Sequence, residues 1–302
     1  MSRIAYATCD PRQPQWEDDQ LSAEVLNGHG VEVEFLAWDD PVVEWDSFDR
    51  VVIRSTWDYG SRLDEFLAWA DRVGPARLRN QPDLVRWNTD KRYLAELDGG
   101  GLPVPPTMLI APGGVVPEFH DEVVIKPVIG AGARDTGRFS PDARPEALAL
   151  LDRLGESDEI AMVQPYLSEI ERFGETAVMV FGGEFAYALK KRAFLPPDQV
   201  APTDDSGIAA AMSDESLVQL GEADPSEIEL ALATVGWLAE RFGELPLFAR
   251  IDTLITSQGP VLMEVEATEP SLYLGQTTAL DRPGAELFAE AVLADLGRVA
   301  VG

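Results

Sequence analysis

The chain has 302 residues, of which 45% are hydrophobic and 25% are charged, a composition typical of a soluble globular protein with two or three packed units. Lys and Arg number 24 against 53 Asp and Glu, which gives a formal net charge of -29. Such a chain repels a nucleic-acid backbone and an anionic membrane, so we expect neither as a partner. A phosphate compound would have to meet the few cations gathered at one place.

The single cysteine, Cys9, excludes an internal disulfide and a cysteine-rich zinc site. The two histidines, His29 and His120, lie far apart and lack the spacing of a zinc protease. The first residues contain no long apolar core before a cleavage site, and no run approaches the roughly 20 apolar residues of a membrane span. We therefore expect a cytoplasmic protein.

Residues 1–86 alternate strands with helices. The apolar run "RIAYAT" precedes an amphipathic helix that ends at "NGHG", and "VEVEFLAW" then alternates at period two. "RVVIRSTWDY" is a further strand, and "SRLDEFLAWADRVG" is a helix. This order predicts a small parallel α/β domain. Ligands of such sheets bind beyond the carboxyl ends of the strands, which here are Asp10 and residues 54–58.

The strand-helix alternation does not continue in residues 87–160. A helix there carries Lys91, and a proline-rich turn precedes "EVVIKPVIGAGARDTGRF". The latter predicts a strand with Lys126, a loop with Gly130 and Gly132, and a returning strand. The loop fits neither the P-loop nor the dinucleotide fingerprint. Glycines between two strands still let backbone N–H groups approach an anion. An ordinary hairpin turn with one surface lysine is the alternative.

Residues 161–302 begin with the apolar strand "IAMVQPYL", which Pro165 interrupts. A proline leaves backbone groups of a strand unpaired and free to bind the edge of a heterocycle. Two hairpins with turns at Gly182–Gly183 and Gln258–Gly259 are each followed by a long helix, which predicts a sheet-plus-helix domain. The polar stretch 195–216 is a candidate mobile loop.

The second hairpin gathers carboxylates. Asp252 lies two residues after Arg250 in one strand, and Glu264 and Glu266 lie two apart in the next. Residues i and i+2 share a face, so these side chains could meet at one end of the sheet. Buried like charges repel, and Mg²⁺ would neutralise them because it prefers hard oxygen ligands. A solvated edge with scattered acids is the alternative.

The motif "LKKR" ends a strand opposite this hairpin and places Lys190 and Arg192 on one face and Lys191 on the other. Cations at a strand end are usually solvated. Three together are nevertheless unusual in a chain with only 24 Lys and Arg. We predict that Lys190 and Arg192 take part in catalysis.

From about residue 87 onward, the order of these motifs resembles the ATP-grasp superfamily of carboxylate-activating ligases. The order is a helix with Lys91, Lys126 before a glycine loop, "QPYL", "GETAV", a basic strand end, "RID" and "MEVE". The resemblance implies an ATP-grasp fold with three parts: an N-terminal parallel α/β domain, a central glycine-loop lid and a C-terminal sheet-plus-helix domain. Lys91 and Lys126 would hold the α- and β-phosphates of ATP, and the loop that contains Gly130 and Gly132 would close over them.

The resemblance also implies an adenine site framed by Gln164, Tyr166 and Leu167, with Glu175 at the ribose hydroxyls. Together with the two lysines at the phosphates, these four residues would account for the adenine, the ribose and the phosphates of ATP.

Asp252, Glu264 and Glu266 would by the same resemblance hold two Mg²⁺ ions, with Mn²⁺ as a substitute, and Arg250 would stabilise the oxyanion of acyl transfer. Many members carry Asn at the last metal position, in an ExN pattern. Here the residue is Glu266. The added negative charge should strengthen metal binding.

The stretches "WDDP", "RSTWDY", "LVRWNTDKRYL" and "TEPSLYL" resemble the ATP-grasp branch that contains the cyclo-ligase forming D-cycloserine from O-ureido-D-serine. This implies an ATP-dependent ligase that activates a small amino-acid-like carboxylate as an acyl phosphate and forms an amide, within one molecule in the cyclising case. Substrate residues are expected at strand ends of the first domain and after the metal strand: Asp10, Arg54, Ser55, Thr56, Trp57, Asp58, Glu269 and Ser271. A structural cap around Trp57 is the alternative.

Two other functions use the same features. A kinase that phosphorylates a hydroxyl would share the ATP and metal residues, but it would release no phosphate. A non-catalytic nucleotide-binding module would keep the strand interrupted by Pro165 and the glycine loop, but it would need no metal carboxylates. The presence of Asp252, Glu264 and Glu266 therefore argues against such a module. A homo-oligomer is compatible with the sequence.

Overall fold

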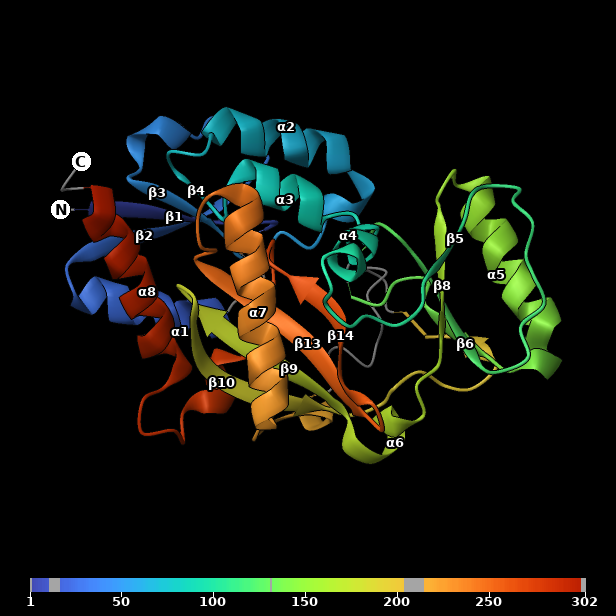
Figure 1. Cartoon of the computed structure of the whole chain (residues 1–302). Coiled ribbons are helices and arrows are strands. Elements are labelled where there is room, and N and C mark those ends of the chain that lie inside the picture. Colours follow the sequence, from blue (N-terminus) through green and yellow to red (C-terminus); the bar gives the residue numbers. More distant parts are fainter. Residues whose placement is uncertain (1, 11–16, 131, 204–214, 300–302) are drawn as a thin grey trace.

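The computed structural model describes residues 2–10, 17–130, 132–203 and 215–299, which form three sheets with their helices (Figure 1). The N-terminal sheet is parallel, with strand order β2-β1-β3-β4. Its elements are β1 (Ser2–Thr8), β2 (Val31–Ala37), β3 (Arg50–Ile53), β4 (Leu78–Arg79), α1 (Glu17–Gly28), α2 (Leu63–Val73) and α3 (Pro82–Asn88). Every residue of β3 is buried, as expected for a strand covered on both faces. The predicted parallel α/β unit is confirmed.

The central sheet is antiparallel, with strand order β11-β7-β6-β8-β5. Its elements are β5 (Met108–Ile110), β6 (Val123–Pro127), β7 (Gly137–Phe139), β8 (Ala161–Pro165), β11 (Gln199–Val200) and α5 (Arg144–Glu156). Leucines of α5 form one core cluster with this sheet. β8 and β11 come after residue 160 in the chain, yet both belong to this sheet: β8 pairs with β5 and β6, and β11 pairs with β7. The helix α4 (Tyr93–Gly99), which precedes β5 in the chain, packs in a core cluster with residues of the C-terminal sheet. The unit boundaries at residues 86 and 160 remain proposals.

The C-terminal sheet has strand order β12-β10-β9-β13-β14. Its elements are α6 (Glu169–Phe173), β9 (Glu175–Phe181), β10 (Glu184–Lys191), β12 (Val218–Gly221), α7 (Pro225–Phe242), β13 (Phe248–Thr256), β14 (Gly259–Glu266), the 3-10 helix η7 (Leu274–Thr277) and α8 (Gly284–Val299). Consecutive residues of β9 point to opposite faces of the sheet. Val178 packs in the core cluster that contains residues of α7, and Met179 packs in the core cluster that contains residues of α8. The two helices therefore cover opposite faces (Figure 1).

The two predicted hairpins are present. Gly182 and Gly183 form the first turn with φ of 56° and 91°, left-handed values that glycine adopts without a steric cost. In the second hairpin Thr256 pairs with Gly259, so the turn lies one residue earlier than predicted. Of the predicted loop 195–216, residues 204–214 lie outside the described part. Among the described helices, none combines the length and apolar character that crossing a membrane requires.

Candidate active site

A β-bulge in β14 determines which way the carboxylates of the second hairpin face. The pairing of β13 with β14 shifts by one residue immediately after Asp252, with Met263 as the extra residue. Before the shift, Asp252 pairs with Glu264 and Arg250 pairs with Glu266. A change of one residue in register turns side chains to the other face of a sheet. The bulge thus places both glutamates on the face of Arg250 and Asp252.

Two cations bind the carboxylates on this face. Arg250 donates from Nε and Nη2 to the two oxygens of Asp252, each at 3.0 Å, and Nη2 also donates to Glu266. Lys191 Nζ, at the end of β10, lies 2.7 Å from Asp252 Oδ2 and 3.0 Å from Glu175 Oε2. Burial raises the pKa of Asp252, but Arg250 and Lys191 outweigh burial and hold this pKa at about 2.

Lys91 and Lys126 approach the same face from the central part of the chain. Lys91 Nζ lies 3.1 Å from Glu264 Oε1 and donates to Gly130 O at 2.5 Å. Burial raises the pKa of Glu264, but Lys91 and Lys126 hold it at about 2. Burial lowers the pKa of Lys126, and the nearby Glu264 offsets this only in part. Both lysines therefore face the predicted metal strand.

The buried carboxylates of this site could carry more negative charge than the neighbouring lysines and Arg250 balance. Burial raises the pKa of Glu266 to about 7, where Arg250 opposes the rise while Glu264 and Asp252 add to it. Burial also raises the pKa of Glu269, just beyond β14, to about 8. Buried carboxylates with raised pKa values favour any ligand that brings positive charge.

No group of three or more His, Cys, Asp or Glu side chains in the described ranges is placed to hold a metal ion. Lysine and arginine side chains bind the carboxylates instead. The donor set of Asp252, Glu264 and Glu266 nevertheless consists of oxygen atoms alone, which suits Mg²⁺. Its surplus of negative charge suits a cation as well. The chemistry of these residues thus fits Mg²⁺, provided that they exchange their present partners for it.

Gly130, at the start of the glycine loop, approaches both the N-terminal unit and Lys91. Gly132 has a φ of 62°, which favours glycine. A Cβ atom on Gly60, in the segment after β3, would lie 3.9 Å from Gly130 Cα. Residues of the N-terminal unit and the loop thus approach each other beside the site.

In the predicted adenine site, the backbone around Pro165 makes more hydrogen bonds than the proline led us to expect. β8 pairs with β6 up to its final proline, and the Tyr166 N–H donates to Glu122 O at 2.8 Å. The Tyr166 ring lies 3.7 Å from the Arg138 guanidinium carbon. Gln164 is buried, and Leu167 is half-buried after it. The proline therefore frees fewer backbone groups than predicted.

Lys190 and Arg192 do not reach the carboxylates of the site. Lys190 Nζ donates to Thr176 Oγ1 at 2.5 Å and lies 3.5 Å from Glu227 of α7, on the opposite face of the sheet. Arg192 is exposed. Lys191, which the sequence interpretation left out of the site, is the residue that meets Asp252. This corrects the choice of face made from the motif "LKKR".

The segment 54–58, predicted to contact substrate, is tied into the fold. Its side-chain partners are Asp19 for Arg54 and Ser55, the Glu269 carbonyl for Trp57, and Trp38 for Asp58. The buried Thr56 hydroxyl has no hydrogen-bond partner among the described residues. Asp10 follows β1, and Ser271 lies two residues after Glu269.

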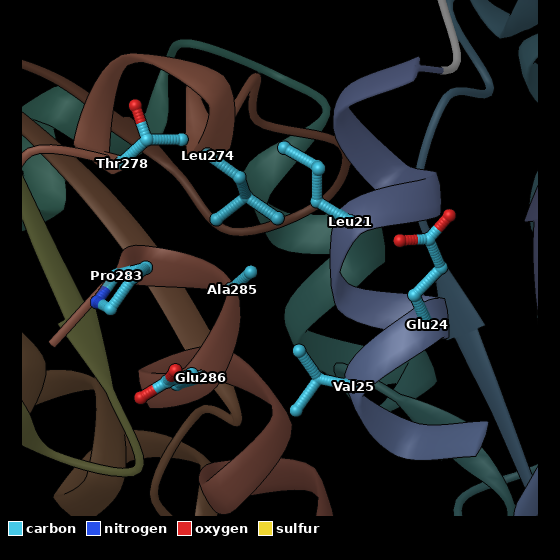
Figure 2. A pocket seen from close by; sticks show the side chains of 8 residues that line it. All are labelled: Leu21, Glu24, Val25, Leu274, Thr278, Pro283, Ala285 and Glu286. Carbon is cyan, nitrogen blue, oxygen red and sulfur yellow. The ribbon is translucent and has the colours of Figure 1, made fainter. Parts of the chain in front are cut away.

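A surface cavity of about 360 Å³ is lined by none of the carboxylates described above. Figure 2 shows its lining residues. The cavity lies between α1 and the segment of η7 and α8, and its lining residues are Leu21, Glu24, Val25, Leu274, Thr278, Pro283, Ala285 and Glu286. This lining has two glutamates and no lysine or arginine. These two carboxylates would repel a triphosphate.

Three comparisons place the chain among known proteins. Residues 4–80 match the family model of the N-terminal domain of D-cycloserine synthetase DcsG. The cycloserine biosynthesis protein DcsG of Streptomyces lavendulae is 34% identical over 279 residues, covering 87% of this chain and 88% of that protein. The crystal structure of D-cycloserine synthetase DcsG superposes with a TM-score of 0.83 and 31% identity, over 98% of this chain and 100% of that one. The ATP-grasp ligase PsnB, solved with a minimal precursor variant, Mg and ADP, has a TM-score of 0.60 and 16% identity, over 97% and 98% of the two chains.

The fold is therefore the ATP-grasp fold. The similarity of the chain to the Streptomyces protein extends along most of both sequences and identifies its family. The chain belongs to the DcsG family.

Proposed function

We propose that the chain uses ATP to activate the carboxylate of a small amino-acid-like substrate as an acyl phosphate and then forms an amide. The ring closure of O-ureido-D-serine to D-cycloserine is the specific reaction that we propose. The observation that carries the proposal is the buried face on which Lys91 and Lys191 meet Glu264 and Asp252. The name of the 34% identical relative supports the choice of product.

The nucleotide side of the site follows from the cations. Lys91 and Lys126 would bind the phosphates, because both approach the same buried carboxylate and carry hydrogens that a phosphate oxygen accepts. The glycine loop beside Lys91 would close over the phosphates. Gln164, Tyr166 and Leu167 would line the adenine, and Glu175 the ribose. These roles are proposals.

Asp252, Glu264 and Glu266 would hold Mg²⁺ during the reaction, with two ions as our proposal and Mn²⁺ as a substitute. The ion supplies neutralisation of phosphate charge and alignment of the attacking oxygen. Arg250, which now binds Asp252 and Glu266, would face the oxyanion that develops at the substrate carbonyl. Lys191 would keep Asp252 ionised.

The proposed reaction has three steps. A substrate carboxylate oxygen attacks the γ-phosphorus of ATP, the bond to the bridging oxygen breaks, and ADP leaves. The nitrogen bound to oxygen then attacks the acyl carbon, phosphate leaves with the bonding electrons, and the nitrogen loses its proton. Water finally attacks the carbamoyl carbon that this nitrogen still carries, the bond to the ring nitrogen breaks, the nitrogen takes up a proton, and carbamate leaves to decompose to ammonia and CO2. The chain must position these groups and exclude water, since an acyl phosphate hydrolyses.

Release of phosphate and ADP in the presence of O-ureido-D-serine tests the proposal. We expect one phosphate per ring formed, and we expect Glu264→Gln to abolish turnover while ADP still binds. ADP with a stable phosphorylated product and no free phosphate would identify a kinase instead. Absence of turnover with every small amino-acid carboxylate would contradict the ligase reaction proposed here.

A further inference from the structure

The loop after β14 is held at each of four successive carbonyls. Residues 269–272 accept hydrogen bonds from Trp57 Nε1 at 3.3 Å, Arg54 Nη2 at 3.3 Å, Arg250 Nη1 at 3.4 Å and the Tyr187 hydroxyl at 2.7 Å, in that order along the loop. A backbone held at every residue cannot turn without breaking one of these bonds. The shape of this loop therefore depends on side chains from other elements.

The first turn of α1 holds Arg54, one of these four donors, in place. Its Nε donates to Asp19 Oδ1 at 2.8 Å, and Ser55 Oγ donates to Asp19 Oδ2 at 2.5 Å. Arg54 is only 2% exposed, and its guanidinium lies over the rings of Phe248 and Phe288. Arg54 Nη2 donates to Pro270 O, so Arg54 acts on the site through the loop that it holds. Its buried Nη1 has no hydrogen-bond partner among the described residues.

Asp18 holds the other end of the same loop. Its Oδ1 accepts the Gly275 N–H at 2.7 Å. Asp18 and Asp19 are adjacent in the first turn of α1, so this turn binds the loop directly at Gly275 and through Arg54 at Pro270. The loop between these two points contains Ser271.

We propose that Asp18, Asp19 and Arg54 are positioning residues that fix the loop 269–275, and that the carboxylate-substrate side of the site depends on them while the ATP side does not. This rests on the proposed function, because it assigns the loop to the substrate side of a ligase. The ATP side depends on lysines that lie on other elements. Loosening the loop should thus affect the two substrates of one enzyme unequally.

Steady-state kinetics of the full chain provide the first test. Arg54→Lys keeps the charge but replaces the two guanidinium nitrogens that bond Asp19 and Pro270 O with one ammonium nitrogen, and Asp18→Ala removes the acceptor for Gly275 N–H. We expect each to raise KM for O-ureido-D-serine about tenfold or more and to change KM for ATP less than about twofold. Asp18→Asn retains an oxygen acceptor and should return KM to within about twofold of the parent value.

Asp295→Asn is the matched control. Asp295 of α8 binds the buried Arg50 at 2.5 Å and Arg79 at 3.0 Å, so it also joins the N-terminal sheet to the rest of the molecule, but without contact to the loop. It should lower the Tm and leave both KM values unchanged. An equal KM effect in this control, or equal changes in the two KM values of Asp18→Ala, would overturn the proposal. So would failure of Asp18→Asn to restore KM.

Amide hydrogen exchange gives a readout that needs no turnover. Amides of residues 269–275 should exchange faster in Asp18→Ala and in Arg54→Lys than in the parent or in Asp295→Asn. Unchanged exchange in this segment in folded Arg54→Lys would contradict the positioning role. A parent protein that does not turn over any carboxylate would contradict the ligase function alone, because the exchange comparison would still test the loop.

Discussion

At the scale of single residues, the consecutive lysines of β10 have opposite environments. Lys191 lies among the buried carboxylates, 2.7 Å from Asp252, whereas Lys190 binds Thr176 and approaches Glu227 under α7. Alternation along a strand produces this difference, and no difference in chemistry between the two side chains is needed.

Replacing each lysine in turn tests this assignment. Lys191→Met removes one of the two cations beside Asp252, so we expect kcat to fall about 100-fold or more. Lys190→Met, the matched control on the other face, should keep kcat within about threefold of the parent. The rate of phosphate release measures both. Equal losses in the two variants would contradict the assignment of Lys191.

Glu269 should make stability depend on pH. Burial raises the pKa of its carboxyl to about 8, above the value of about 4.3 in an unfolded chain. Its contribution to stability is therefore present at low pH and is lost as the pH rises through about 8. Glu269→Gln cannot ionise, so we expect its Tm to exceed that of the parent by about 2 °C or more at pH 9 and to match it near pH 5.

Glu264→Gln is the control for that prediction because it removes the same charge. The pKa of Glu264 is held at about 2, so its ionised form stabilises the fold above the unfolded pKa. Its replacement should lower the Tm at pH 9. Shifts of the same sign in both variants would show that only the net charge matters. Thermal unfolding followed by circular dichroism measures each.

At the scale of elements, α7 stabilises the sheet from the face opposite the site. Its first turn is a capping box, in which the Asp224 side chain accepts from Ser226 N at 2.9 Å and Glu227 Oε2 accepts from Asp224 N at 3.0 Å. These bonds satisfy backbone donors that the helix itself leaves unpaired. The helix packs on β13 on the face away from the carboxylates of the site.

Removing the cap should therefore affect stability and not activity. We expect Asp224→Ala to lower the Tm by about 2–4 °C, because the first turn loses its acceptor, and to leave kcat at 25 °C unchanged. Asp224→Ser, which can still cap, should retain most of the stability. Loss of kcat at a temperature where Asp224→Ala remains folded would contradict the separation of the two faces.

The sequence predicts much of this organisation. Glycines mark the first hairpin, period-two patterns mark the strands, and the spacing of Arg250, Asp252, Glu264 and Glu266 places them together. Lys191 was missed because alternation defines two faces without saying which is buried. The apolar Leu189, two residues before it and fully buried, was the available signal.

Contacts between distant segments were beyond such reasoning. Arg54 follows a strand end in the way that a ligand-binding residue would, yet its partner Asp19 is 35 residues away in a helix whose facing surface no local pattern reveals. In the same way, β8 reads as the first strand of the last unit, although its hydrogen-bond partners are β5 and β6.

At the scale of the whole molecule, the charge of -29 opposes compaction. Raising NaCl from about 10 to about 100 mM shortens the screening length from about 30 to about 10 Å, so we expect the Tm to rise by a few degrees. The same step at pH 5, where carboxylates begin to protonate, should give a smaller rise. A Tm that falls with salt would mean that ion pairs outweigh the net repulsion.

Lys91 joins two parts of the molecule through one ammonium group. Its nitrogen faces the Gly130 carbonyl and the Glu264 carboxylate, while an ammonium has only three hydrogens to donate. One hydrogen would be left for a phosphoryl oxygen in the proposed site, and a second could come only by releasing the loop or the strand. If Lys91 has the proposed role, nucleotide binding and rearrangement of this junction would be coupled by the number of hydrogens on one nitrogen.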